Sequence, residues 1–154
     1  MRDLDAVAVG QTVLLVEDEA LVRRALGEVL RRSGYHVLKA CDGTEALHIH
    51  KRHRGGIHAV VTDVQMPGMT GVDLAARLRE LQPGLKVLFV CGSVPKSISF
   101  ARIRSQPGTA FLQKPFFANS LLRTLENLVV MDTEPLPEAP REDEALDAEA
   151  GILA

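Results

Sequence analysis

Three carboxylates and one lysine are the residues of this sequence best suited to chemistry. Glu17, Asp18, Asp63 and Lys114 each follow directly after, or close behind, a short apolar segment. Carboxylates that pack together repel one another unless a proton or a cation neutralises them. Their hard oxygen atoms suit Mg²⁺, and an ammonium group can stabilise charge on transferring phosphoryl oxygens. These residue types therefore predict a Mg²⁺ site beside a carboxylate that can form an aspartyl phosphate.

Short apolar segments alternate along the chain with amphipathic ones. The apolar segments predict strands over 12–16, 35–40, 57–62, 86–90 and 109–112. Apolar residues at helical spacing predict helices over 20–32, 44–53, 72–81, 96–104 (the weakest) and 118–130. Repeated strand–helix units with short connections are typical of a parallel sheet that is covered on both faces.

The predicted fold is α/β, a flavodoxin-like doubly wound five-stranded parallel sheet in the order 2-1-3-4-5. Right-handed crossovers leave few other topologies for five such units. This order places the ends of the first and third strands side by side at the switch point. Glu17 and Asp18 should therefore lie next to Asp63, although more than forty positions separate them in the sequence. Lys114, after the fifth strand, brings a positive charge to the same edge.

Composition divides the 154 residues into three parts. Residues 1–11 are predicted to be a short leader and 12–131 a single domain. Residues 132–154 form an acidic, proline-containing tail with eight acidic residues and one arginine, which predicts disorder. The tail is too short and too acidic to be a DNA-binding domain. The net charge of -2 provides no overall attraction to nucleic acid.

The cysteines and the hydropathy pattern indicate a cytoplasmic protein. Cys41 and Cys91 are the only cysteines and have no CxxC spacing, which fits a reducing compartment better than a disulfide framework. No stretch is long enough to span a membrane, and the N-terminus is acidic rather than signal-like. We therefore expect neither a membrane nor a nucleic acid among the partners.

Three separated motifs resemble the receiver domain of two-component response regulators, of the type also found in hybrid histidine kinases. They are VLLVEDE at 13–19, VTDVQMPGMTG at 61–71 and FLQKPF at 111–116. The motifs occur in the family's order, and the resemblance covers about residues 12–130. It implies a phosphoprotein that acts as a switch in phosphorelay signal transduction.

The resemblance implies a role for each residue of the predicted site. Asp63 matches the phosphoacceptor, and Glu17 and Asp18 match the acidic pair that holds Mg²⁺ together with it. Gln65 matches the position whose backbone carbonyl completes the metal site. Lys114 matches the lysine that contacts the phosphoryl group, and the peptide that follows it is usually cis in the family.

One position departs from the family pattern. Receivers usually carry Ser or Thr at the end of the fourth strand, where this chain has Cys91. The family hydroxyl binds the phosphoryl group, and an aromatic residue of the fifth strand, matched here by Phe111, then moves inward. A thiol is a weak hydrogen-bond donor. We therefore hypothesise that Cys91 weakens the conformational response, unless the nearby hydroxyl of Ser93 replaces it.

The resulting functional prediction is a single-domain response regulator, either a monomer or a weak dimer. Its phosphoryl donor would be a phosphohistidine on a sensor histidine kinase or a histidine phosphotransfer protein. The phosphoryl group would then switch a surface that an unknown downstream protein reads. Such a protein is not an enzyme with a separate substrate, because it transfers phosphate only onto itself and loses it by slow hydrolysis. A shuttle role in a phosphorelay is a variant, and a phosphorylation-independent interaction module is the main alternative.

Other interpretations of the same residues fit less well. A phosphatase resembling the haloacid dehalogenases needs a second Asp at position 65, where Gln stands, and a flavin protein needs a hydroxyl-rich loop after the first strand. The histidines lack zinc-site spacing and are better explained as a solvated helix face: His48, His50, His53 and His58. The basic residues of the first helix are expected to face solvent. Phe100, Ile103 and Phe111 could form either a partner surface or core.

Overall fold

The computed structural model describes residues 10–53, 56–92, 103 and 105–130, which form five strands and four helices. The strands are β1 (Thr12–Val16), β2 (His36–Ala40), β3 (Ala59–Asp63), β4 (Lys86–Cys91) and β5 (Thr109–Gln113). The helices are α2 (Ala20–Arg32), α3 (Gly43–Arg52), α4 (Gly71–Leu81) and α6 (Ala118–Val130). Every residue of β1 and β3 is buried, as expected for central strands that are rich in Val and Leu.

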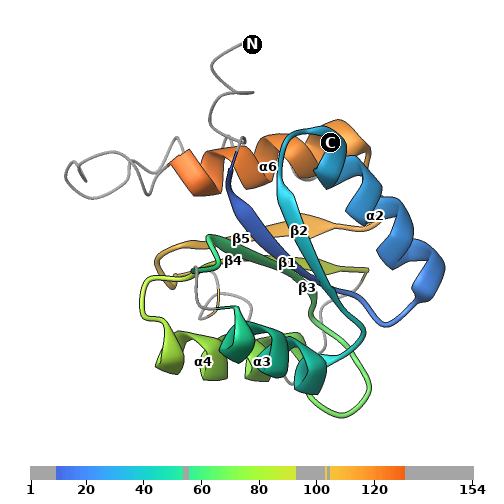
Figure 1. The fold of residues 1–154 in the computed structure, drawn as a ribbon. Coiled ribbons are helices and arrows are strands. Elements are labelled where there is room, and N and C mark those ends of the chain that lie inside the picture. Colours follow the sequence, from blue (N-terminus) through green and yellow to red (C-terminus); the bar gives the residue numbers. More distant parts are fainter. Residues whose placement is uncertain (1–9, 54–55, 93–102, 104, 131–154) are drawn as a thin grey trace.

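The strands form one parallel sheet in the order β2-β1-β3-β4-β5 (Figure 1). This confirms the predicted doubly wound order and places β1 beside β3 at the centre. In the register between these strands, Val16 lies opposite Thr62. The residues that follow β1 therefore leave the sheet at the same edge as Asp63, the last residue of β3.

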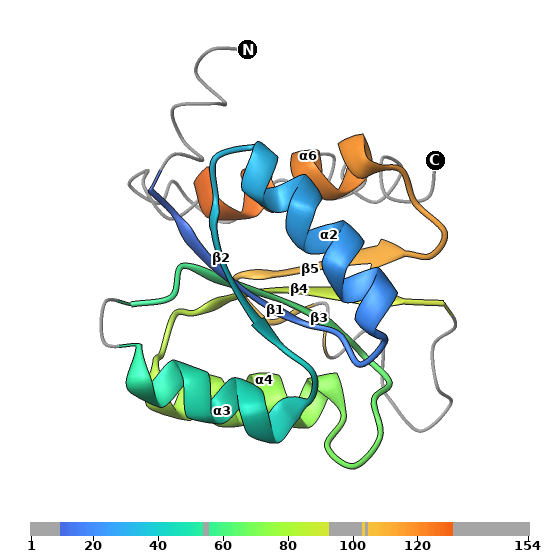
Figure 2. The same cartoon turned by 45° about the vertical axis from the view of Figure 1, so that its right-hand side comes forward.

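Helices cover both faces of the sheet. In Figures 1 and 2, α2 and α6 lie on one side and α3 and α4 on the other. Alternate residues of each strand point to opposite faces, so that the core has two parts. Leu15 packs in the part that contains Leu30 and Leu125, from α2 and α6. Leu14 packs in the part that contains Leu74 of α4.

Two helices begin at side-chain caps that the sequence supplies. The Asp42 carboxylate accepts a hydrogen bond of 2.8 Å from the backbone N–H of Glu45 at the start of α3. The Thr70 hydroxyl accepts one of 3.1 Å from the N–H of Asp73 at the start of α4. Asp and Thr are favoured at this position because their side chains satisfy N–H groups that the first helical turn leaves unpaired.

Element boundaries differ from the predictions by at most two residues. β3 begins at Ala59, although Ile57 is buried, and the strand includes Asp63. Before β3, the His58 ring Nδ1 accepts a 2.9 Å hydrogen bond from the N–H of Thr12. Apart from Ile103, the predicted helix at 96–104 lies outside the described residues, as does the acidic tail. Across the described parts of the chain, no helix has the length and apolar character needed to cross a membrane.

Candidate functional site

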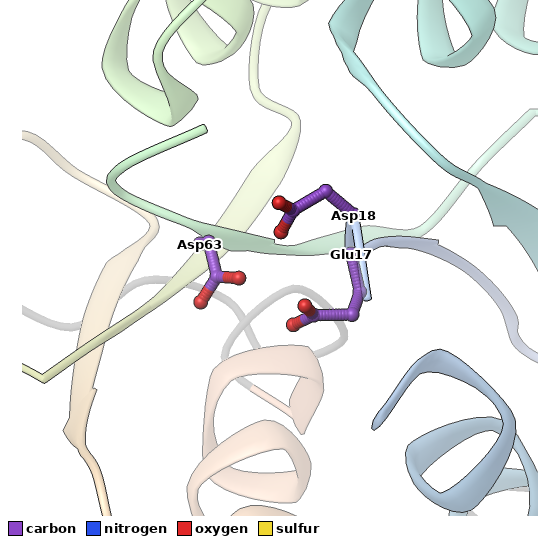
Figure 3. A group of neighbouring side chains, drawn as sticks. All are labelled: Glu17, Asp18 and Asp63. Carbon is purple, nitrogen blue, oxygen red and sulfur yellow. The ribbon is translucent and has the colours of Figure 1, made fainter. Parts of the chain in front are cut away.

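The predicted carboxylates meet at one edge of the sheet. One oxygen of Glu17, one of Asp18 and one of Asp63 all lie within 4.8 Å of one another. Glu17 is 3% exposed and Asp63 is 7% exposed, whereas Asp18 is open to solvent. Figure 3 shows Glu17 and Asp18 coming from the end of β1 and Asp63 from the end of β3. The cluster is thus anchored in the core on two sides and accessible on the third.

Lys114 reaches this cluster from the end of β5. Its ammonium Nζ lies 2.9 Å from Oδ1 of Asp63. The N–H of Lys114 donates a 2.9 Å hydrogen bond to the carbonyl of Cys91, which continues the β4–β5 pairing and positions the side chain. The peptide between Lys114 and Pro115 is cis, as the family resemblance implies. Three strand ends therefore contribute charged groups to one site.

Backbone hydrogen bonds hold the end of β1. The N–H of Glu17 donates a 3.1 Å hydrogen bond to the carbonyl of Ala40 in β2. The N–H of Glu19 donates one of 3.0 Å to the carboxylate of Glu17 itself. Arg23, on the first turns of α2, donates one of 2.8 Å from Nη1 to the backbone carbonyl of Glu17. Both the main chain and the side chain of Glu17 are consequently fixed by neighbours.

The end of β3 is packed just as closely. The N–H of Val64 donates a 3.0 Å hydrogen bond to the carbonyl of Val90, and the N–H of Gly71 donates one of 2.8 Å to the carbonyl of Val64. A Cβ atom at Gly71 would overlap the backbone carbonyl oxygen of Asp63. Only glycine allows α4 to start against the carbonyl of Asp63.

The electrostatics of the cluster favour a bound cation. Burial, followed by a hydrogen bond with Asp63, raises the pKa of Glu17 from 4.5 to about 7. Burial of the Lys114 ammonium opposes its charge, but the contact with Asp63 outweighs this and the pKa of Lys114 is raised. Three hard oxygen donors at a partly open edge match the ligands that Mg²⁺ prefers. Their mutual repulsion is the kind that a divalent cation relieves.

Cys91 and Phe111 are part of the buried core. Cys91 ends β4 and is buried in the core part that also contains Phe89 and Phe111. Burial, with a contribution from the Asp63 charge, raises the pKa of the Cys91 thiol. The rings of Phe89 and Phe111 are stacked, with centroids 5.2 Å apart. Ile103 is also buried in this core part, whereas Phe100 and Ser93 lie outside the described residues.

Gln65 and the histidines are the other predicted residues that the structure describes. Gln65 is exposed in the loop after β3, and the metal-binding role of its carbonyl stays a prediction. His50 contacts the Gln82 side chain at 2.8 Å. The ring of His53 stacks on that of His36 at 6.0 Å. The solvated-face interpretation was therefore incomplete for the histidines, some of which make defined contacts.

A comparison with protein-family models decides the family. The model of the response regulator receiver domain matches residues 13–126. The chain belongs to the response regulator receiver family. The receiver motifs in the sequence, the strand order of the sheet and the carboxylates at its edge all agree with this membership.

Known proteins similar to this receiver include both long and short chains. The sensor kinase CckA of Brucella abortus is 39% identical over 121 residues, which are 77% of this chain but only 12% of that kinase. The response regulator receiver protein CpdR of the same organism is 31% identical over 124 residues, covering 77% of this chain and 96% of CpdR. The crystal structure of the receiver domain from the hybrid histidine kinase CckA superimposes with a TM-score of 0.65 at 33% identity. It covers 77% of this chain and 98% of that one.

Two residues that position the site were not predicted from the sequence. Arg23 was expected to face solvent with the other basic residues of its helix, yet it is half-buried and bonded to the Glu17 carbonyl. Gly71 entered only as the last residue of the 61–71 motif, whereas it starts α4 against Asp63. Both contacts depend on how a loop folds onto a helix, which periodicity does not reveal.

Proposed function

We propose that this receiver is a phosphorylation-controlled response regulator that accepts a phosphoryl group on Asp63. The observation that carries the proposal is the 2.9 Å contact between Lys114 Nζ and Asp63 Oδ1 beside Glu17 and Asp18. A nucleophilic carboxylate, a fixed ammonium group and an acidic pair are the parts that phosphoryl transfer to Asp requires.

The transfer follows from the position of these groups. A carboxylate oxygen of Asp63 attacks the phosphorus of a phosphohistidine, the new P–O bond forms and the P–N bond breaks. The donor imidazole, protonated on its other ring nitrogen, leaves with the bonding electron pair as a neutral imidazole. Lys114 lies against Asp63 and stabilises negative charge on the phosphoryl oxygens. Hydrolysis of the aspartyl phosphate resets the protein.

Glu17, Asp18 and Asp63 are the residues that would hold Mg²⁺, with the backbone carbonyl of Gln65 as a further ligand. Their oxygen atoms are close enough together to share one ion. When bound, the ion supplies positive charge opposite the phosphoryl oxygens. Because Asp18 is exposed while Glu17 is buried, one side of the site stays accessible to the donor.

The donor is proposed to be a sensor histidine kinase or a histidine phosphotransfer protein in the cytoplasm. Two large apolar side chains close to site residues in the sequence are exposed: Leu21, at the start of α2, is 78% exposed, and Phe117, just before α6, is 75% exposed. Each follows a site residue, Asp18 or Lys114, by three positions. Exposed apolar groups beside a reactive centre suit contact with a protein donor. Downstream, phosphorylation would bias the region of Cys91 and Phe111, which a partner protein reads.

The direct test uses a small-molecule phosphoryl donor. The purified chain is incubated with acetyl phosphate and Mg²⁺, and its intact mass is measured. We expect the added mass of one phosphoryl group, which is absent after chelation of the metal and absent from Asp63→Asn. An unchanged wild-type mass, with no Mg²⁺ binding in a calorimetric titration, would refute the proposal.

Cys91 favours one second candidate function. With a thiol at the switch position, the protein could act as an interaction module that retains the receiver shape without depending on phosphorylation. This candidate predicts that a partner binds wild type and Asp63→Asn equally well. The response-regulator proposal predicts that treatment with acetyl phosphate and Mg²⁺ changes partner affinity only in the wild type.

A further inference from the structure

Arg23 links the start of α2 to the end of β1. Its backbone N–H donates a 2.8 Å hydrogen bond to the carbonyl of Glu19, which closes the first turn of the helix. Its side chain folds back, and Nη1 donates a 2.8 Å hydrogen bond to the carbonyl of Glu17. The same residue therefore ties the helix to the peptide that joins Glu17 to Asp18.

The orientation of that peptide determines the directions in which the side chains of Glu17 and Asp18 leave the main chain. Consecutive side chains of an extended strand point to opposite faces. Glu17 and Asp18 nevertheless both bring an oxygen within 4.8 Å of Asp63, so the chain must turn between them. The N–H of Glu17 is held by Ala40 on one side of the residue, and its carbonyl is held by Arg23 on the other. These two bonds set the direction in which Asp18 leaves the strand.

The Arg23 side chain contacts the main chain of the acidic pair rather than its carboxylates. Its hydrogen bond goes to the backbone carbonyl of Glu17 and not to a carboxylate oxygen of Glu17, Asp18 or Asp63. The guanidinium therefore holds the peptide that joins Glu17 to Asp18.

We propose that Arg23 is a positioning residue for the metal site. Through its bond with the Glu17 carbonyl, it holds Glu17 and Asp18 in the geometry that binds a divalent cation. The inference rests on the proposed Mg²⁺ site and adds a residue from outside the carboxylate cluster. Partners of this kind, which orient metal ligands without touching the metal, typically contribute about ten- to a hundred-fold in metal affinity.

The sign of the effect separates position from charge. Removing a positive charge near an acidic site strengthens the binding of a cation, or leaves it unchanged where salt screens the charge. Loss of a positioning bond weakens cation binding instead. Arg23→Gln removes both, and Arg24→Gln removes the same charge from the exposed neighbour. If position dominates, Arg23→Gln will weaken Mg²⁺ binding, whereas Arg24→Gln will not.

The experiment is a calorimetric titration of Mg²⁺ into the full chain, with the urea unfolding of each metal-free variant measured in parallel. We expect about a tenfold or greater loss of Mg²⁺ affinity in Arg23→Gln and unchanged or slightly tighter binding in Arg24→Gln. Arg23→Lys keeps the charge and one donor but lacks the planar fork, and its affinity should fall between wild type and Arg23→Gln. A merely structural role would lower the free energy of unfolding but leave the Mg²⁺ affinity of the folded protein unchanged.

Each negative result of this titration leads to a different conclusion. Arg23→Gln that binds Mg²⁺ as tightly as wild type, or more tightly, would overturn the role of Arg23 while leaving the proposed function intact. Should Arg23→Gln not fold, the same criterion applies to Arg23→Lys, for which wild-type affinity would overturn the proposal. Wild type that binds no Mg²⁺ would overturn both the proposed metal site and this inference.

Discussion

Glu17 and Asp63 bring carboxylate oxygens within 4.8 Å of each other, although they stand at the ends of different strands. In the metal-free protein a proton between two buried carboxyl groups relieves their repulsion. The same repulsion disappears when a divalent cation binds. The repulsion between the two carboxylates therefore lowers the stability of the metal-free protein and favours the binding of a cation. The pH dependence of this stability can be predicted.

Glu17→Gln should stabilise the metal-free protein at alkaline pH. The pKa of Glu17 is 4.5 in the unfolded chain and about 7 in the folded one, so the folded state binds more protons between these values. The contribution of Glu17 to the free energy of unfolding therefore falls as pH rises through this window. Relative to wild type, Glu17→Gln should gain about 2 kcal/mol between pH 5 and pH 8.

Urea unfolding in a chelating buffer at the two pH values measures this gain. Adding Mg²⁺ at pH 8 provides the control, because a ligand that binds only the folded state stabilises it. Wild type should become more stable with Mg²⁺, whereas Glu17→Gln should respond weakly. A difference between the two proteins that stays constant from pH 5 to pH 8 would show that Glu17 titrates normally.

Gly71→Ala should slow phosphorylation of Asp63. The new methyl group would overlap the carbonyl of Asp63, and the β3–α4 loop would have to move. A displacement of about 1 Å in a reacting group can cost on the order of a hundredfold in rate, so we expect a loss of about ten- to a hundred-fold. Gly27→Ala is the matched control, because its Cβ meets only the flexible end of the Lys39 side chain. Equal acetyl phosphate reaction rates in both variants would argue against this effect.

Arg79→Ala should destabilise the fold without changing the site chemistry. The Arg79 guanidinium donates hydrogen bonds to the carbonyls of Leu85, Pro107 and Gly108 and to the side chains of Gln106 and Thr109. Losing them leaves backbone acceptors unsatisfied and should cost about 2 kcal/mol in the free energy of unfolding.

Two further substitutions on the same helix calibrate the Arg79 prediction. Arg79→Lys should recover little of the stability, because an ammonium group cannot reach several acceptors in a plane. Arg77→Ala, at an exposed position, should change stability by less than about 0.5 kcal/mol. The extent of phosphorylation by acetyl phosphate should be the same in all three. Full recovery of stability by Lys would mean that one contact alone matters.

Much of this structure was predictable from the sequence because the relevant signals are local. Val and Leu runs predict buried strands, and the five strand–helix units leave few topologies, so the sheet order and the meeting of Asp63 with Glu17 and Asp18 followed. The cis peptide before Pro115 followed from the family resemblance. The start of β3 could not be predicted in this way, because Ile57 is buried although the strand begins only at Ala59.

Contacts that depend on tertiary packing were not predictable in the same way. Arg23 has the sequence surroundings of a solvent-facing helix residue, and only the path of the β1–α2 loop brings the Glu17 carbonyl to it. Phe111 could have been core or surface from its pattern alone. The stacked ring of Phe89, on the neighbouring strand, settles that it is core.

Cys91→Thr should enlarge the conformational response to phosphorylation. A hydroxyl group donates a stronger hydrogen bond to a phosphoryl oxygen than the buried Cys91 thiol can. Hydrogen exchange before and after treatment with acetyl phosphate and Mg²⁺ should change more around Phe111 in Cys91→Thr than in wild type. An equal change in the two proteins would remove Cys91 as an attenuator of the switch.

The most direct test of the central claim is the location of the phosphoryl group. The chain is treated with acetyl phosphate and Mg²⁺ and then with sodium borohydride, which reduces an acyl phosphate to an alcohol but leaves free carboxylates intact. Peptide mass spectrometry then identifies the reduced residue. We predict that Asp63 alone is reduced, and only in the presence of Mg²⁺. Reduction at another carboxylate would contradict the assignment of Asp63 as the phosphoacceptor. The absence of any reduced residue would also contradict it, in protein that binds Mg²⁺ and has been treated with its phosphorylated donor protein in place of acetyl phosphate.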